Sequence, residues 1–131
     1  MKITADTNLL VRALTEDHAT QSKAAQTALG KADTVALTIP TLCELVWVLQ
    51  GYKIRPNDIA GALRGLLDGA NVVVNRPAAE AGLAMLDAGG DFADGVIAYE
   101  GNWLGADTFI SFDKKAVRLI EAQGKSARLL A

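Results

Sequence analysis

Short apolar runs alternate along this chain with longer stretches whose apolar residues recur at helical spacing. The short runs predict strands at residues 3–5, 34–37, 71–75, 108–112 and 127–130. The longer stretches predict one helix that opens at Asp6 and others over residues 23–29, 41–50, 55–67, 77–87, 91–100 and 114–123. Strands alternating with such helices imply βαβ units and a mainly parallel sheet covered on both faces. We therefore predict one α/β domain over residues 1–131, with a three-layer α/β/α structure of four to five strands.

Composition is that of a globular protein. Half of the 131 residues are hydrophobic and 21% are charged, so the chain can bury a real core. No run approaches the about 18 apolar residues of a membrane span. Asp6 and Arg12 interrupt the N-terminal segment, which therefore does not resemble a signal peptide. Cys43 is the single cysteine, so no internal disulfide is expected; we predict a cytoplasmic protein without a membrane partner.

Two classes of catalytic site are not expected from the residues present. His18 is the single histidine of the chain. One histidine cannot build a zinc site based on several histidines. No serine or cysteine nucleophile with a neighbouring base is visible either, so a covalent mechanism of ordinary type is not expected.

Charge is unevenly distributed, although the net charge is only −2. Residues 77–113 carry seven acidic residues and no Lys or Arg, whereas residues 114–131 carry five basic residues and one acidic residue, Glu121. This pattern fits a cation site beside an anion-binding rim. Ordinary solvated helix faces explain it equally well.

Four carboxylates are candidates for a common site. Asp6 and Asp113 each follow a predicted strand, which in open α/β sheets is the edge where ligands bind. Glu44 is the only charge in a very apolar helix, so we expect it not to be fully exposed and to need a partner. Asp94 lies near a helix start, three residues after Asp91. Helix capping or a dipole role remains open for each aspartate, and an outward orientation remains open for Glu44.

Several carboxylates at one edge would repel each other unless protons or cations intervened. A hard divalent cation such as Mg²⁺ or Mn²⁺ prefers oxygen ligands and would satisfy them. A metal held in this way can polarise a phosphoryl oxygen and activate a water molecule, which is the chemistry of phosphodiester hydrolysis.

Four segments, in this order, resemble the PIN-domain family, specifically the VapC-type toxin ribonucleases of bacterial toxin–antitoxin pairs. They are residues 5–10, Glu44 within residues 42–45, residues 91–98 and residues 108–116. The resemblance implies that Asp6, Glu44, Asp94 and Asp113 form an acidic quartet that binds Mg²⁺ or Mn²⁺ and cuts RNA. It also implies a parallel sheet, a homodimer and inhibition by a small antitoxin. The RNA target and the number of metal ions stay open.

Several neighbours of the quartet have secondary roles open to them. Thr7, Asn8 and Ser111 could hydrogen-bond a carboxylate or a metal-bound water, but capping and turn roles are as plausible. The basic residues Lys114, Lys115 and Arg118 follow Asp113 and either meet phosphates or form a solvated face. Gly95 stands where many relatives have Ala, a change expected only to loosen the helix slightly.

Three other functions are alternatives for an α/β chain with acids after its strands. A phosphatase with an aspartyl nucleophile requires a second acid two residues after Asp6. Asn8 stands at that position, which counts against this class. A receiver domain requires an Asp after the third strand. Residues 75–77 contain none, which counts against this class as well. The remaining alternative is a non-catalytic protein-interaction module, in which the four acids are caps and surface residues.

A partner surface is predicted on the helix at residues 41–50. Its apolar residues cover more than one face and include Trp47, with Tyr52 close by. A helix that is apolar all round is either deeply buried or also used at an interface. We therefore expect a homodimer, and by the family resemblance an antitoxin segment in apolar grooves near the site.

Overall fold

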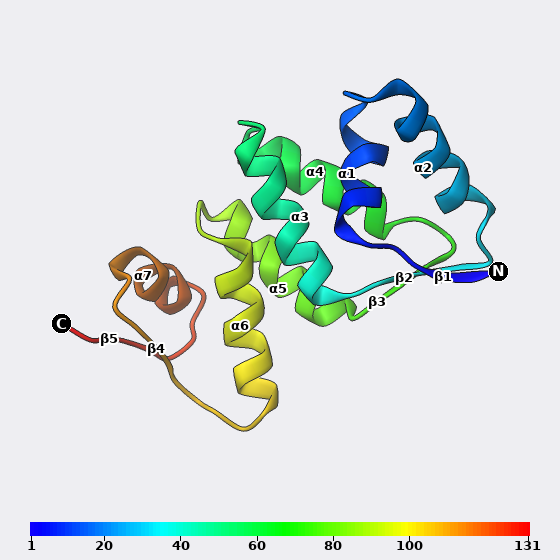
Figure 1. Cartoon of the computed structure of the whole chain (residues 1–131). Coiled ribbons are helices and arrows are strands. Elements are labelled where there is room, and N and C mark those ends of the chain that lie inside the picture. The colour runs from blue at the N-terminus through cyan, green and yellow to red at the C-terminus, as the bar shows by residue number, and fades with distance from the viewer. The chain divides into compact units, whose positions relative to one another are not determined.

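A computed structural model describes all residues from 1 to 131 (Figure 1). The strands and helices follow one another in the predicted order. In chain order they are β1 (Lys2–Thr4), α1 (Thr7–Thr15), α2 (Ala19–Lys31), β2 (Thr34–Leu37), α3 (Ile39–Gly51), α4 (Pro56–Leu67), β3 (Val72–Val74), α5 (Arg76–Asp87), α6 (Phe92–Trp103), β4 (Phe109–Ser111), α7 (Lys114–Ala122) and β5 (Ala127–Leu129). None of the helices combines the length and apolar character that crossing a membrane requires.

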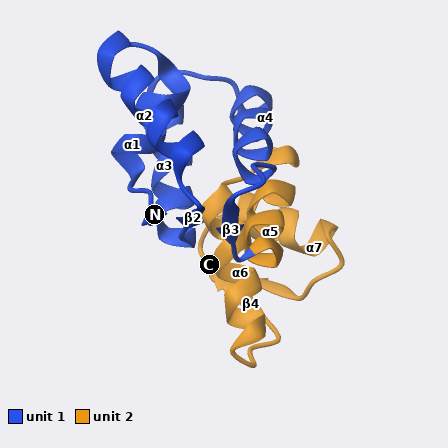
Figure 2. Ribbon diagram, turned by 90° about the vertical axis from the view of Figure 1, so that its right-hand side faces the viewer, with its two compact units in different colours: residues 1–75 blue, residues 76–131 orange.

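The chain divides into two compact units (Figure 2), Met1–Asn75 and Arg76–Ala131. Five strands are present and every ladder between them is parallel. The predicted α/β class with parallel strands is therefore confirmed. The strands pair as one sheet of three and one of two, whereas a single sheet was expected. That the two units fold as one domain stays a prediction.

The first unit is built on a sheet in the order β1-β2-β3. The central strand β2 places Val35 and Leu37 in the core, at 1% and 3% exposure, because alternate residues of a strand point to the same face. Its prediction at residues 34–37 is confirmed to the residue. Helix α3 begins after Thr38, whose hydroxyl oxygen accepts a hydrogen bond from the Thr41 N–H, and Pro40 lies in its first turn.

The second unit contains α5, α6, α7 and the two strands β4 and β5. One face of the β4–β5 pair packs on α7: Phe109 and Ala127, which are partners in the ladder, lie against a core of Met85, Ala116 and Ile120. The predicted helix and strand boundaries in this unit agree with the structure to within three residues.

Two glycines let α5 and α6 approach closely. A Cβ at Gly82 would lie 2.6 Å from the ring of Phe92, and one at Gly95 would lie 2.8 Å from the Cβ of Met85 and still closer to the Ala81 carbonyl oxygen. Real Cβ atoms are not found so close to other atoms. Gly95 was expected to loosen its helix slightly, and the structure adds that a side chain there would push the two helices apart.

Helix α2 is the element whose bounds differ most from the prediction. It was predicted over residues 23–29 and ended by Gly30, but it extends from Ala19 to Lys31. Its N-cap is His18, whose Nδ1 accepts a hydrogen bond from the Gln21 N–H at 3.2 Å. Histidine is an uncommon N-cap, and the sequence pattern did not indicate it.

Candidate active site

Asp6 stands where β1 ends and α1 begins, as predicted. Its Oδ1 accepts a hydrogen bond from the Leu9 N–H at 2.9 Å, so Asp6 is the N-cap of α1. The cap uses one carboxylate oxygen, and the residue is exposed at the surface. The capping role is thus confirmed, and it leaves Oδ2 available to a ligand.

Glu44 is exposed on α3, and the expectation of a shielded carboxylate was wrong. The buried face of this helix consists of Ile39, Thr41, Leu42, Leu45, Val46 and Leu49. Position 44 lies outside that face, as does Trp47, which is 75% exposed. The apolar sequence therefore reflects one core face plus an exposed tryptophan, and not a helix buried all round.

Thr7 connects the first turn of α1 to α3. Its Oγ1 donates a hydrogen bond to Glu44 Oε1 at 3.0 Å. Thr7 directly follows Asp6 in the chain, so this bond holds the Glu44 carboxylate near the end of β1. The predicted need of Glu44 for a partner is met by this hydroxyl.

Asp94 lies in the first turn of α6 and is half-buried. Burial raises the pKa of its carboxyl above the ordinary value, and the negative charges of Asp91 and Asp113 raise it further. Asp91 is the N-cap of the helix, with Oδ1 accepting from the Ala93 N–H at 3.1 Å. Asp91 and Asp113 therefore each act electrostatically on Asp94.

Asp113 follows β4 and caps α7, as Asp6 follows β1 and caps α1. Its Oδ1 accepts a hydrogen bond from the Ala116 N–H at 3.1 Å. Its own N–H donates to Ser111 Oγ at 3.0 Å, which fixes the turn between strand and helix. Ser111 thus takes the turn role that had been left open for it.

The candidate residues form two groups within the units. Asp6, Thr7 and Glu44 belong to the first unit, and Asp91, Asp94 and Asp113 to the second. No group of three or more His, Cys, Asp or Glu side chains in the structure is arranged to hold a metal ion. The joining of the quartet at one sheet edge stays a prediction, since β1 and β4 belong to different sheets.

The family follows from a comparison of the sequence with family models. The model of the PIN domain matches residues 3–121, a span that includes all four predicted acids. The chain belongs to the PIN domain family. PIN domains are generally metal-dependent nucleases with a three-layer α/β/α fold, and the parallel strands and seven helices found here agree with that fold. A comparison with curated proteins found no match.

The side chains fit the kind of metal that PIN nucleases use. Carboxylate oxygens are the ligands preferred by Mg²⁺ and Mn²⁺. Burial raises the pKa of Asp94 above its ordinary value, and the negative charges of Asp91 and Asp113 add to this effect. A bound cation would relieve this repulsion, so the donor set suits a hard divalent ion.

Proposed function

We propose that this PIN domain is a ribonuclease dependent on Mg²⁺ or Mn²⁺, and that Asp6, Glu44, Asp94 and Asp113 together bind the metal. The observation that carries the proposal is the family match over residues 3–121. In support of it, Asp6, Glu44 and Asp113 are exposed and Asp94 is half-buried, so none of the four is sealed within a core.

Hydrogen bonds restrain three of the four acids. The caps of α1 and α7 restrain Asp6 and Asp113, since each uses one oxygen in a hydrogen bond to a helix N–H. The hydroxyl of Thr7 restrains Glu44. When bound, a divalent cation supplies a polarised phosphoryl oxygen and an activated water. The protein's own contribution is to hold four oxygen ligands in place.

The substrate strand would be held by basic residues that follow Asp113. Lys114, Lys115 and Arg118 of α7 are exposed, so their charges are available to phosphates. A single-stranded or looped RNA suits the reaction better than a duplex. Attack must be in line with the leaving oxygen, and a flexible backbone can reach that geometry.

An RNA-cleavage assay tests the proposal. Purified protein is incubated with a mixed RNA pool and Mn²⁺, beside an EDTA control and the variant Asp6→Asn. We expect cleavage that both controls abolish. Cleavage that survives both would come from a contaminating nuclease or a different mechanism. Absence of cleavage with any RNA or divalent metal, in protein free of bound inhibitors, would contradict the proposal.

We further propose that the protein is a cytoplasmic toxin of VapC type, a homodimer inhibited by a small antitoxin. This rests on the resemblance of four segments to such toxins. Trp47 and Tyr52, at 75% and 44% exposure, offer an apolar surface on and after α3 that a partner chain would cover. Light scattering that finds a monomer at micromolar concentration would contradict the dimer.

A second candidate, a non-catalytic interaction module, has one specific observation in its favour. Trp47 and Trp103 are 75% and 80% exposed, and large exposed aromatic residues are common at protein interfaces. Titration with Mn²⁺ separates the candidates. An interaction module has no reason to bind the ion tightly, whereas the nuclease should lose its affinity for Mn²⁺ in Asp94→Asn.

A further inference from the structure

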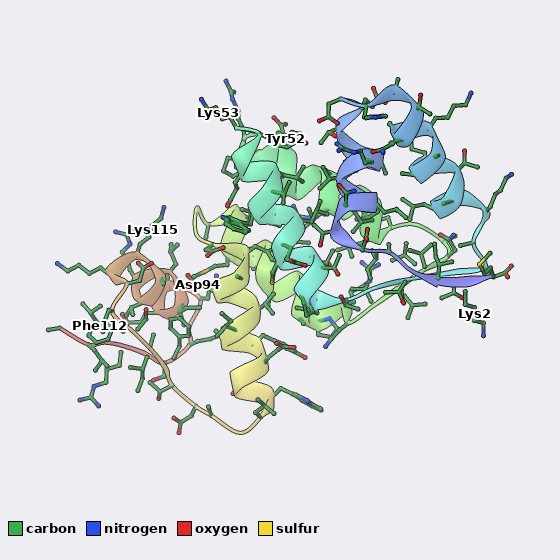
Figure 3. The ribbon with its side chains drawn as sticks, viewed as in Figure 1. Lys2, Tyr52, Lys53, Asp94, Phe112 and Lys115 are labelled. Atoms are coloured by element: carbon green, nitrogen blue, oxygen red, sulfur yellow. The ribbon has the colours of Figure 1, made fainter.

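Phe112 is an exposed aromatic side chain directly before Asp113. It is 74% exposed, although phenylalanine is among the residue types most often buried. It follows β4, and Figure 3 shows it beside the first turn of α7. Because the phenyl ring is exposed, it does not contribute to the core. The residues around it, next to the proposed metal ligand Asp113, therefore indicate which kind of ligand it contacts.

Strand β4 anchors the segment that carries the ring. Phe109 packs against the core of the second unit, and Ser111, two residues on, shares its face of the strand. Ile110 lies on the opposite face and is 53% exposed. Phe112 is the first residue after the strand, so its exposed ring lies at the end of an anchored segment.

Basic residues occur on both segments next to Phe112. Lys114 and Lys115 are exposed in the first turn of α7, two and three positions after Phe112 in the chain, and Figure 3 labels Lys115. Arg128 is the partner of Ile110 in the β4–β5 ladder, so it lies on the same sheet face as Ile110, and it is exposed. An exposed aromatic ring with basic residues on the neighbouring segments matches a ligand in which flat rings alternate with phosphates.

We propose that Phe112 is a stacking platform for a base of single-stranded RNA, while Lys114, Lys115 and Arg128 contact the adjoining phosphates. The inference rests on the proposed ribonuclease function, and it adds a residue that positions the substrate. Stacking on an aromatic ring tolerates every base and requires an unpaired one. The platform therefore selects single strands without selecting a sequence.

Binding to two matched oligonucleotides tests this platform. The Asp6→Asn background prevents cleavage, and the probes are a single-stranded RNA and an abasic strand with the same number of phosphates. Phe112→Ala should weaken binding to the RNA about tenfold and leave binding to the abasic strand unchanged. Phe112→Tyr keeps the ring and should bind within about twofold of the parent.

Two further variants separate stacking from charge and from general apolar contact. Lys115→Gln should weaken binding to both probes and reduce the slope of log affinity against log salt by about one. Phe112→Ala should not change this slope. Leu130→Ala removes another exposed apolar side chain, 40% exposed near the end of the chain, and should bind like the parent.

The outcomes distinguish this inference from the proposed function. If Phe112→Ala lowers the affinity for the two probes equally, or does not lower it at all, the platform is overturned even if the unmutated protein cleaves RNA in Mn²⁺. A loss confined to the base-bearing probe supports the platform even if no cleavage is found, in which case the nuclease proposal fails alone. If Phe112→Ala instead impairs capture of a second copy of the chain and not RNA binding, the face is a protein interface and the inference is wrong.

Discussion

Thr7 and Glu44 are 37 positions apart in the chain, yet Thr7 Oγ1 donates a hydrogen bond to Glu44 Oε1 at 3.0 Å. The bond joins the first turn of α1 to the exposed side of α3. It restrains a carboxylate that would otherwise rotate freely at the surface. If Glu44 is a metal ligand, Thr7 is a positioning residue for it.

Thr7→Ala should therefore lower Mn²⁺ affinity about tenfold, since the loss of a group that orients a ligand usually costs that much. Thr7→Ser retains the hydroxyl and should restore most of the affinity. Isothermal titration of both variants checks this. Equal affinities for Thr7→Ala and the unmutated protein would show that the hydrogen bond is structural only.

Glu44→Gln keeps the side-chain volume and removes the charge. Because Glu44 is exposed, we expect the substitution to change the folding free energy of the protein by less than about 0.5 kcal/mol. Mn²⁺ affinity should fall at least about tenfold, since ligand charge sets the affinity of such sites. The matched control is Glu100→Gln, an exposed glutamate of α6, which should bind Mn²⁺ normally. An unchanged affinity in Glu44→Gln would remove Glu44 from the site.

Gly95→Ala should destabilise the protein by about 1–3 kcal/mol, because the new methyl group meets the backbone of α5 and the contact has to be relieved by separating the helices. Gly101→Ala, in the same helix, meets nothing within 4 Å and should be neutral or stabilising by up to about 1 kcal/mol. Urea unfolding measures both. Similar stabilities for the two variants would contradict the close packing of α5 on α6.

The contacts of Asp17 predict that the folded protein loses stability at acidic pH. Hydrogen bonds from Thr15 and Tyr52, at 2.8 and 3.0 Å, and the nearby Arg12 guanidinium lower the pKa of its carboxyl below the ordinary 3.8. A lowered folded-state pKa adds stability above the unfolded value, and this stability is lost as pH falls through the folded one.

The measurement compares stability from pH 5 to about pH 2 in the unmutated protein and in Asp17→Asn. We expect the unmutated protein to lose more stability below about pH 4 than the variant, which has no carboxyl to protonate at this position. Parallel curves for the two proteins would mean that the contacts of Asp17 contribute nothing to folding.

Local features of this protein were determined by sequence alone. Caps act over three residues, so Asp6 and Asp113 could be placed at the starts of α1 and α7 from their neighbours. The strand at residues 34–37 followed from a short apolar run with β-branched residues. The four acidic positions were likewise chosen from motifs within short segments, and their joint role as metal ligands stays a prediction.

Tertiary structure decided what depends on residues far apart in the chain. The exposure of Glu44 follows from which side of α3 faces the core, and its bond to Thr7 needs two helices to meet. The requirement for glycine at position 95 arises from the backbone of α5. Hydrophobic spacing specifies that a helix has a buried face, but packing geometry decides which atoms lie against that face. This geometry depends on several segments together, so no single segment of the sequence determines it.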